Sequence, residues 1–386
     1  MMRLDSVQAL RAIAALVVFA CHLFAIEAGH AGRAAPLTQW FENGAYGVDL
    51  FFVISGFIMV WVAADLPRGL ASARDFVIAR VTRIYPLWWL FAGTMALFLL
   101  YFKGVPWDPD RLDPKGLDGT VHLIKSLFLW PQPAHPVLGV GWTLVHEMYF
   151  YVGFALLLLC VPVRWRLRAI LGWGAIVLIG AMAGLGTAFG RNLVELVFSP
   201  LTLEFVMGSL VGYMIKAGWK DYARATAILG CVGLLIGFVL VDNATGGLLL
   251  APFGLEDPVY GLMMWGRVII FGLPAALLLY GLVALDVQGK LSRYMSKRLV
   301  RVGDWSYALY LSHTLTISAV GRVVYGVIEP QTLFATLIYF ITVIAATFIV
   351  AALAYHYFER PLIRYFRRWR AKPAAYSAES ANAPAE

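Results

Sequence analysis

Residues 333–357 read LFATLIYFITVIAATFIVAALAYHY, a run without Asp, Glu, Lys or Arg. A helix needs roughly 20 predominantly apolar residues to cross about 30 Å of hydrocarbon, so this run is long enough to span a membrane. Small residues such as Ala and Thr inside the run are typical of packed membrane helices, because they let neighbouring helices approach closely. The run therefore predicts a transmembrane helix.

Similar apolar runs recur along the whole chain. They predict an all-α, polytopic membrane helix bundle of about ten transmembrane helices. The expected spans are residues 8–27, 44–64, 86–102, 140–160, 168–188, 193–215, 225–241, 264–285, 303–321 and 333–357.

The composition excludes a soluble protein with an ordinary surface. Of the 386 residues, 61% are hydrophobic and only 14% are charged, whereas soluble domains carry about 25% charged residues. The net charge is +8, but most Lys and Arg residues lie in alternate connections between spans, so a nucleic-acid partner is not predicted. The positive-inside rule places those connections, and both chain ends, in the cytoplasm.

The chain divides into two expected regions. Residues 1–365 form an integral membrane domain, and residues 366–386 form a cytoplasmic tail that is basic at first and then rich in Ala, Ser and Pro. The end of the tail is expected to be disordered, because it has too few apolar residues to form a core. The three cysteines form no CxxC pair or metal spacing, so no metal site is predicted.

Ionisable residues inside membrane spans are costly, so each one is a functional candidate. The first span contains Arg11 near its cytoplasmic side and His22 nearer its outer side. Their spacing is about three helical turns, which places both side chains on one face of the helix. A packing role is the alternative for His22, but its alignment with Arg11 favours a catalytic role.

Two further charged features flank the second span. Asp49 lies at its outer end, where it is either a catalytic-site residue or an N-cap or first-turn acid that stabilises the helix. Arg80 and Arg83 lie in the expected loop before the third span and can share one helical face. Guanidinium groups suit phosphate oxygens, and the alternative is that the pair serves membrane topology alone.

The fourth span carries a polar stripe. Thr143, His146, Glu147 and Phe150 follow helical spacing, so His146 and Glu147 form a candidate acid and base pair. In the sixth span, Glu204 precedes Gly208, and the structural interpretation of this carboxylate is preferred over a catalytic one.

The ninth span adds Tyr310 and His313, which share one helical face with Ser306. These residues support two hypotheses. One is a membrane-embedded enzyme, and the other is a proton-coupled transporter or glycan flippase that uses the same His and Glu as a proton relay.

Several segments taken together resemble the membrane acyltransferase-3 family, and specifically its exopolysaccharide O-acetyltransferase branch. The similarity extends over roughly residues 3–365. The matching segments are Leu4–Ala12, the Arg11 and His22 spacing, Gly47–Met59, Arg80 and Arg83 followed by Tyr85-Pro86, Gly141–Tyr151, Leu203–Phe205, Gly303–His313 and Glu359–Pro361.

The resemblance implies transfer of an acyl group, usually acetyl, from cytoplasmic acetyl-CoA to a sugar hydroxyl of an exopolysaccharide or other envelope glycan. The acceptor is then a lipid-linked or nascent polysaccharide, and the location is the bacterial inner membrane, in contact with its lipids. It also implies that Arg11, Arg80 and Arg83 bind the donor.

Within that implied reaction, His22 is expected to be the general base, oriented by Glu147 or Asp49. One departure concerns the fourth span, where Val145-His146-Glu147 stands in place of an Asn-Tyr-Glu-like run. The role of His146 therefore stays open, and His146, His313, Tyr310 and Glu204 are further candidate residues.

Overall fold

The fold is known from a computed structural model. It describes residues 4–31, 41–101, 119–186, 190–240, 256–257, 261–262, 264–291, 295–328, 330 and 332–369. Most of the expected tail, residues 370–386, lies outside the described residues.

The described residues are almost entirely helical, which confirms the predicted all-α fold class. The helices are α1 (Asp5–Ala31), α3 (Gly47–Ala63), α4 (Leu70–Tyr101), α6 (Gly119–Leu127), α7 (Trp142–Cys160), α8 (Arg166–Met182), α9 (Leu193–Val197), α10 (Thr202–Lys216), α11 (Ala223–Leu240), α12 (Met264–Arg267), α13 (Leu273–Val287), α14 (Lys297–Ile328), α15 (Leu333–Leu353) and α16 (Arg360–Phe366). Two short strands, β1 (Glu256–Asp257) and β2 (Gly261–Leu262), pair antiparallel.

Short 3₁₀ and π-helical turns connect or interrupt these helices. The 3₁₀ turns are Glu42–Tyr46, Gly139–Gly141, Val163–Trp165 and Arg367–Trp369, and the π-helical turns are Val268–Gly272 and Ala354–Glu359. The two π turns join α12 to α13 and α15 to α16, so each pair forms one continuous helical segment.

Every expected span overlaps a helix. Within the described ranges, eight helical segments are long and apolar enough to cross a membrane, and Ala223–Val239 is a shorter apolar helix. The third expected span lies in α4. The chain is therefore a multi-pass membrane protein.

The structure corrects the predicted loop before the third span. Residues 70–85 were expected to belong to a loop that ends with Arg80 and Arg83, but they form the first half of α4. Pro86 lies inside this helix rather than at its start. The reason is that Ala73, Phe76 and Ile84 recur at helical spacing and are buried in the core that includes α7, which outweighs the cost of an internal proline.

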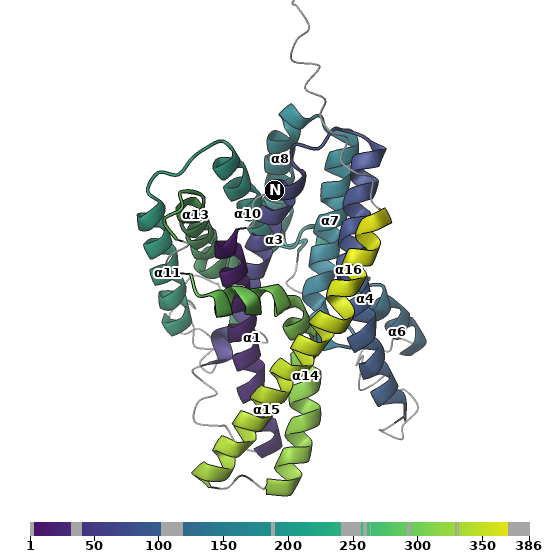
Figure 1. Ribbon diagram of the computed structural model, residues 1–386. Coiled ribbons are helices and arrows are strands. Elements are labelled where there is room, and N and C mark those ends of the chain that lie inside the picture. The colour runs from purple at the N-terminus through teal and green to yellow at the C-terminus, as the bar shows by residue number, and fades with distance from the viewer. Residues whose placement is uncertain are drawn as a thin grey trace, which may run out of the picture.

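The helices form a bundle around α1, α3 and α14 (Figure 1). Helix α1 packs against α14 and α3, α3 packs against α10, and α11 packs against α13. Helices α4 and α7 pack together on the other side of the bundle, and α16 contacts α4 there. The start of α1 and the end of α16 lie toward the same end of the bundle (Figure 1), as expected if both chain ends share one side of the membrane.

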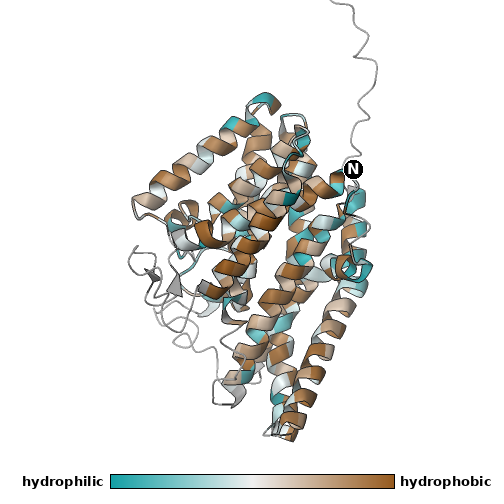
Figure 2. Ribbon diagram, turned by 90° about the vertical axis from the view of Figure 1, so that its left-hand side faces the viewer, coloured by the Kyte–Doolittle hydropathy of each residue, from teal (hydrophilic) through white to brown (hydrophobic). Residues whose placement is uncertain are grey.

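The outer surface of the bundle is strongly apolar. Figure 2 shows hydrophobic residues along nearly the full length of the helices. Large apolar side chains are exposed on several of them, including Ile179 on α8, Val239 on α11, Val327 on α14 and Ile341 on α15. Contiguous apolar surface of this extent marks a membrane-contacting face, so these side chains face lipid.

Glycines permit the two closest helix crossings. A Cβ atom at Gly208 of α10 would lie 1.8 Å from the carbonyl oxygen of Val53 in α3. A Cβ atom at Gly303 of α14 would lie 2.0 Å from the carbonyl oxygen of Gln8 in α1. Gly208 thus lets α3 approach α10 closely, as small residues do where membrane helices pack.

The α1–α14 crossing is expected to depend on Gly303. Gly303→Leu should lower the midpoint of thermal unfolding in detergent by several degrees, because the new side chain meets the α1 backbone and must push the helices apart. Gly326→Leu is the matched control, since a Cβ atom at Gly326 of the same helix would have no atom within 4 Å. Equal midpoints for the two variants would contradict the tight crossing.

Candidate active site

A cavity of about 310 Å³ lies between α1, α3, α4, α7 and α14. Its polar lining residues are Gln8, Arg11, Ser55, Arg80, Arg83, Thr143, Glu147, Tyr151, Ser306, Tyr307 and Tyr310. Leu4 and Val7 also line it, so the cavity reaches the end of the bundle where the chain begins. Arg11, Arg80 and Arg83, the three residues that the family resemblance implies for donor binding, therefore all line this one cavity.

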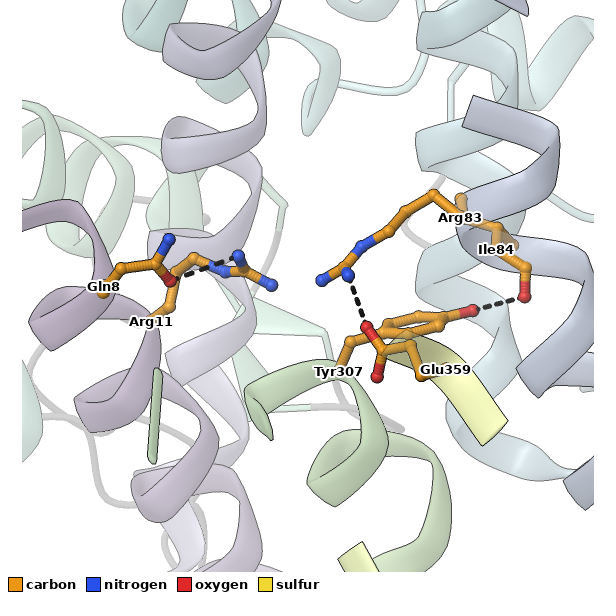
Figure 3. Close-up of polar contacts among 6 residues, drawn as sticks. All are labelled: Gln8, Arg11, Arg83, Ile84, Tyr307 and Glu359. Carbon is orange, nitrogen blue, oxygen red and sulfur yellow. Dashed lines mark hydrogen bonds and ion pairs between the residues drawn. The ribbon is translucent and has the colours of Figure 1, made fainter. Parts of the chain in front are cut away.

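Two of these arginines face each other across the cavity. Figure 3 shows the guanidinium groups of Arg11, on α1, and Arg83, on α4, pointing toward one another. Arg11 donates a hydrogen bond to Oε1 of Gln8 at 3.4 Å. Like charges held in this way repel each other unless an anion lies between them, so the arrangement suits a negatively charged ligand.

Arg83 also has a fixed carboxylate partner. Its Nη1 atom forms an ion pair with Oε1 of Glu359, whose side chain is almost fully buried. The guanidinium lies 5.4 Å from the ring centroid of Tyr307, and the Tyr307 hydroxyl donates to the Ile84 carbonyl oxygen at 2.8 Å (Figure 3). Glu359 is the last residue of the π-helical turn Ala354–Glu359, a turn type often found at functional sites.

Arg80 differs from Arg83 in its partners. Its guanidinium lies 5.3 Å from the Phe76 ring centroid and 5.6 Å from that of Tyr151. Its Nε atom is buried and has no hydrogen-bond partner within the described part of the chain. Two aromatic faces thus hold the Arg80 charge at the cavity wall and leave donor groups for a ligand.

Glu147 is anchored on the cavity wall. Its Oε1 atom accepts hydrogen bonds from the Ser55 hydroxyl at 3.0 Å and from the Tyr151 hydroxyl. It supplies negative charge beside the arginines. In the part of the chain that the structure describes, Glu147 and Glu359 are the two carboxylates within electrostatic range of Arg11 and Arg83. With Arg80 there are three guanidinium groups at the cavity, so positive charge is in excess there.

Tyr310 is a lining residue of the cavity that also contacts His313. Its hydroxyl lies 2.8 Å from the Thr143 hydroxyl and donates to the Val140 carbonyl oxygen at 3.0 Å. On its other side, the Tyr310 ring centroid is 5.9 Å from that of His313. Tyr310 therefore lines the cavity and also contacts His313, whereas neither His313 nor His22 is among the residues that line the cavity.

His22 and His313 form a pair of their own. Nδ1 of His22 lies 3.3 Å from Nε2 of His313 and 3.0 Å from the Val18 carbonyl oxygen. Nδ1 of His313 lies 3.1 Å from the Leu309 carbonyl oxygen. His22 lies on α1 and His313 on α14, so the two side chains meet because these helices pack against each other.

The expectation that Glu147 or Asp49 orients His22 is wrong. Glu147 bonds to Ser55 and Tyr151 instead. Asp49 is fully buried and accepts hydrogen bonds from Arg267, with Nε to Oδ1 at 3.2 Å and Nη2 to Oδ2 at 2.7 Å. A fully buried carboxylate needs a paired charge. Arg267 provides that charge for Asp49, and no hydrogen bond links Asp49 to His22 among the described residues.

The Arg267 ion pair forms a second buried polar cluster. The guanidinium of Arg267 lies 5.2 Å from the Tyr46 ring centroid and 5.6 Å from that of Trp142. Glu204 is also fully buried and lies within electrostatic range of Asp49 and Arg267. Both Glu204 carboxylate oxygens are buried without a hydrogen-bond partner among the described residues, so the structural interpretation of Glu204 stays a prediction.

His146 and Glu147 do not form a pair in the structure. His146 is buried, and its Nδ1 atom donates to the Trp142 carbonyl oxygen at 3.1 Å. Its ring packs 6.0 Å from the Phe52 ring centroid. Adjacent residues of a helix point about 100° apart, which explains why Glu147 reaches the cavity wall and His146 does not.

The sequence analysis did not name Ser55, Tyr151, Arg267, Tyr307 or Glu359 as candidate site residues, although all of these except Arg267 lie in the segments that resemble the family. Arg267 lies inside an expected span, so the rule that intramembrane charges mark functional sites would have found it. Glu359 lies just beyond the expected end of the last span. No sequence signal pairs it with Arg83, because the two residues meet only through the packing of α4 against the last helical segment.

The bundle and its arginine-lined cavity define a membrane-embedded protein whose cavity suits an anionic ligand. The family model for the acyltransferase domain of the acyltransferase-3 family matches residues 4–356. The chain is 34% identical over 339 residues to exopolysaccharide production protein ExoZ of Rhizobium meliloti, which covers 86% of this chain and 93% of that protein.

A second relative is acyltransferase MdmB of Streptomyces mycarofaciens, 29% identical over 99% of this chain and 97% of that protein. No solved structure matches the chain. The chain belongs to the acyltransferase-3 family and is an acyltransferase. This membership favours the enzyme over the transporter that the sequence left as an alternative.

Proposed function

We propose that the protein transfers an acetyl group from acetyl-CoA to a sugar hydroxyl of an exopolysaccharide or a related envelope glycan. The observation that carries the proposal is the cavity in which Arg11, Arg80 and Arg83 converge. Among the described residues, Glu147 and Glu359 are the carboxylates within electrostatic range of Arg11 and Arg83. Coenzyme A is strongly anionic, and guanidinium groups bind its phosphates by charge-assisted hydrogen bonds. The printed name of ExoZ, an exopolysaccharide production protein, supports the class of acceptor.

The donor is proposed to enter from the cytoplasm. The cavity reaches Leu4 and Val7 at the start of α1, and the distribution of Lys and Arg favours a cytoplasmic location for both chain ends. In the proposed orientation, the end of the cavity near Leu4 and Val7 faces the cytoplasm, the compartment that supplies acetyl-CoA. The membrane is then the inner membrane of a bacterium, and the acceptor is a lipid-linked or nascent polysaccharide.

His22 is proposed to be the general base. It takes the proton of the sugar hydroxyl as the hydroxyl oxygen bonds to the acetyl carbonyl carbon. The carbon–sulfur bond of the thioester breaks, and the imidazolium of His22 returns the proton to the departing thiolate of coenzyme A. Atoms and charges balance without a metal or a redox partner.

The proposal requires that the thioester reach His22 past Tyr310. The Tyr310 ring lies beside His313, while its hydroxyl is held by Thr143 and Val140 on the cavity side. We expect movement of the Tyr310 side chain to open a path from the donor cavity past His313 toward His22. Side-chain rotation of this kind is common when a ligand binds.

Acetyl transfer is tested with purified protein in proteoliposomes, [acetyl-¹⁴C]acetyl-CoA and the exopolysaccharide of the source organism. We expect acceptor-dependent release of free thiol and label on the polysaccharide that mild alkali removes, as an O-acetyl ester requires. Arg80→Leu should raise the KM for acetyl-CoA by roughly tenfold or more, since a charge-assisted hydrogen bond contributes about 1.5–3 kcal/mol.

Arg74→Leu is the matched control for Arg80→Leu. Arg74 lies on the same helix, but its side chain is exposed and pairs only weakly with Asp75. The KM for acetyl-CoA should therefore stay near that of the unmodified protein. The proposal is contradicted if free thiol release does not depend on polysaccharide, or if the two variants change the KM equally.

A further inference from the structure

The pairing of His22 with His313 suggests a role for the second histidine. We propose that His313 is a positioning residue that holds the His22 imidazole in the tautomer with a free lone pair on Nε2. The inference rests on the proposed function, in which His22 is the general base. The inference specifies two further points: which nitrogen of His22 takes the proton, and which side chain selects that nitrogen.

The first step concerns His22. Its Nδ1 atom lies 3.0 Å from the Val18 carbonyl oxygen. A carbonyl oxygen only accepts hydrogen bonds, so Nδ1 must carry the ring proton. A neutral imidazole has one N–H donor and one acceptor nitrogen. The lone pair of His22 therefore lies on Nε2, which is the nitrogen available as a base.

The second step concerns His313. Its Nδ1 atom lies 3.1 Å from the Leu309 carbonyl oxygen and must carry the ring proton for the same reason. Its Nε2 atom is then an acceptor, and this atom faces Nδ1 of His22 at 3.3 Å. The Nδ1–H group of His22 is thus shared between the Val18 carbonyl oxygen and the His313 lone pair.

The opposite assignment satisfies fewer contacts. If His313 donated from Nε2, it would be an imidazolium, because its Nδ1 is already a donor to Leu309. His22 would then present a lone pair on Nδ1 to the Val18 carbonyl oxygen, and the two lone pairs would repel. The neutral pair with both protons on Nδ1 satisfies all three contacts.

Packing holds His313 in this orientation. Its side chain is buried at the α1–α14 crossing, and its ring lies edge-on to Phe19 at a centroid distance of 6.5 Å. The Tyr310 ring covers another side at 5.9 Å. A 180° rotation of the His22 ring would put the carbon Cδ2 in the place of Nδ1 and break the contacts to Val18 and His313, so the free Nε2 keeps its position.

The pair also affects the reaction itself. When His22 takes the proton of the sugar hydroxyl, its Nδ1–H group becomes part of a cation. Hydrogen bonds from a charged donor are about twice as strong as neutral ones, so the bond to His313 strengthens as the reaction proceeds. An interaction that strengthens in the transition state raises kcat, and it leaves binding of acetyl-CoA unchanged.

Two substitutions separate positioning of His22 from simple packing. In His313→Gln, the amide oxygen lies near the place of Nε2 and can accept from His22. In His313→Asn, the shorter amide lies near the place of Nδ1, so it keeps the bond to Leu309 but cannot reach His22. We expect His313→Gln to keep kcat within about threefold and His313→Asn to lose at least about tenfold, with the same KM for [acetyl-¹⁴C]acetyl-CoA.

The outcomes distinguish this inference from the proposed function. If the unmodified protein transfers no acetyl group, the proposed function fails. If it does transfer acetyl but His313→Asn is as active as His313→Gln, or more active, the positioning role is overturned. Thermal unfolding in detergent shows that each variant is folded.

A second measurement needs no substitution at His313. Nitrogen-15 spectra of the unmodified protein with labelled histidine report the tautomer of each ring, and the His22 signals are assigned by their loss in His22→Asn. We expect protonated Nδ1 and unprotonated Nε2 in both rings. A protonated Nε2 on neutral His22 would overturn the inference, whatever the activities of the variants.

Discussion

His22→Asn is expected to lower the rate of acetyl transfer by roughly 10²–10⁴-fold, the contribution typical of a positioned general base. The Asn amide can still donate to the Val18 carbonyl oxygen, which His22 bonds at 3.0 Å, so the helix should keep its local contacts. The Asn side chain has no basic nitrogen at the place of Nε2, so it cannot take the proton of the sugar hydroxyl. The measurement is kcat with [acetyl-¹⁴C]acetyl-CoA and polysaccharide.

The control for this substitution is His356→Asn, the same change at an exposed position of the last helical segment. It should transfer acetyl at close to the normal rate. The affinity of the His22→Asn protein for acetyl-CoA should also stay within a few fold, because His22 does not line the arginine cavity. Near-normal acetyl transfer by His22→Asn would remove His22 from the mechanism.

The second large effect is expected at the ion pair between Arg83 and Glu359. Arg83→Leu should lower the free energy of unfolding by about 3 kcal/mol, because it leaves a buried carboxylate without its charge partner. Glu359 is only 2% exposed at its side chain, whereas Arg83 is 26% exposed. Most of the loss therefore comes from the unpaired Glu359. Unfolding in detergent, followed by tryptophan fluorescence, measures the difference.

The double variant Arg83→Leu with Glu359→Gln separates stability from donor binding. The neutral amide is less costly to bury than an unpaired carboxylate, so much of the lost stability should return. Acetyl-CoA affinity should stay weak, since the cavity still lacks the Arg83 guanidinium. If the double variant recovers donor affinity together with stability, Arg83 supports the fold alone and does not bind the donor.

The sequence alone predicted the membrane bundle, because the requirement for apolar spans acts on each helix separately. The run at residues 333–357 is a clear example, and each of the other expected spans also overlaps a helix. The resemblance to acyltransferase-3 proteins was likewise visible in short local motifs. Arg11, Arg80 and Arg83 were predicted to act together, and all three line one cavity.

The tertiary structure alone decided which polar side chains are partners. Sequence spacing places Arg11 and His22 on one helical face, yet Arg11 faces the cavity and Arg83 while His22 faces His313. Asp49 pairs with Arg267, far away in the sequence. The physical reason is that helical periodicity determines only the face on which a side chain lies. Its partner depends on which helix packs against that face, and the close approach at Gly303 and Gly208 sets that packing.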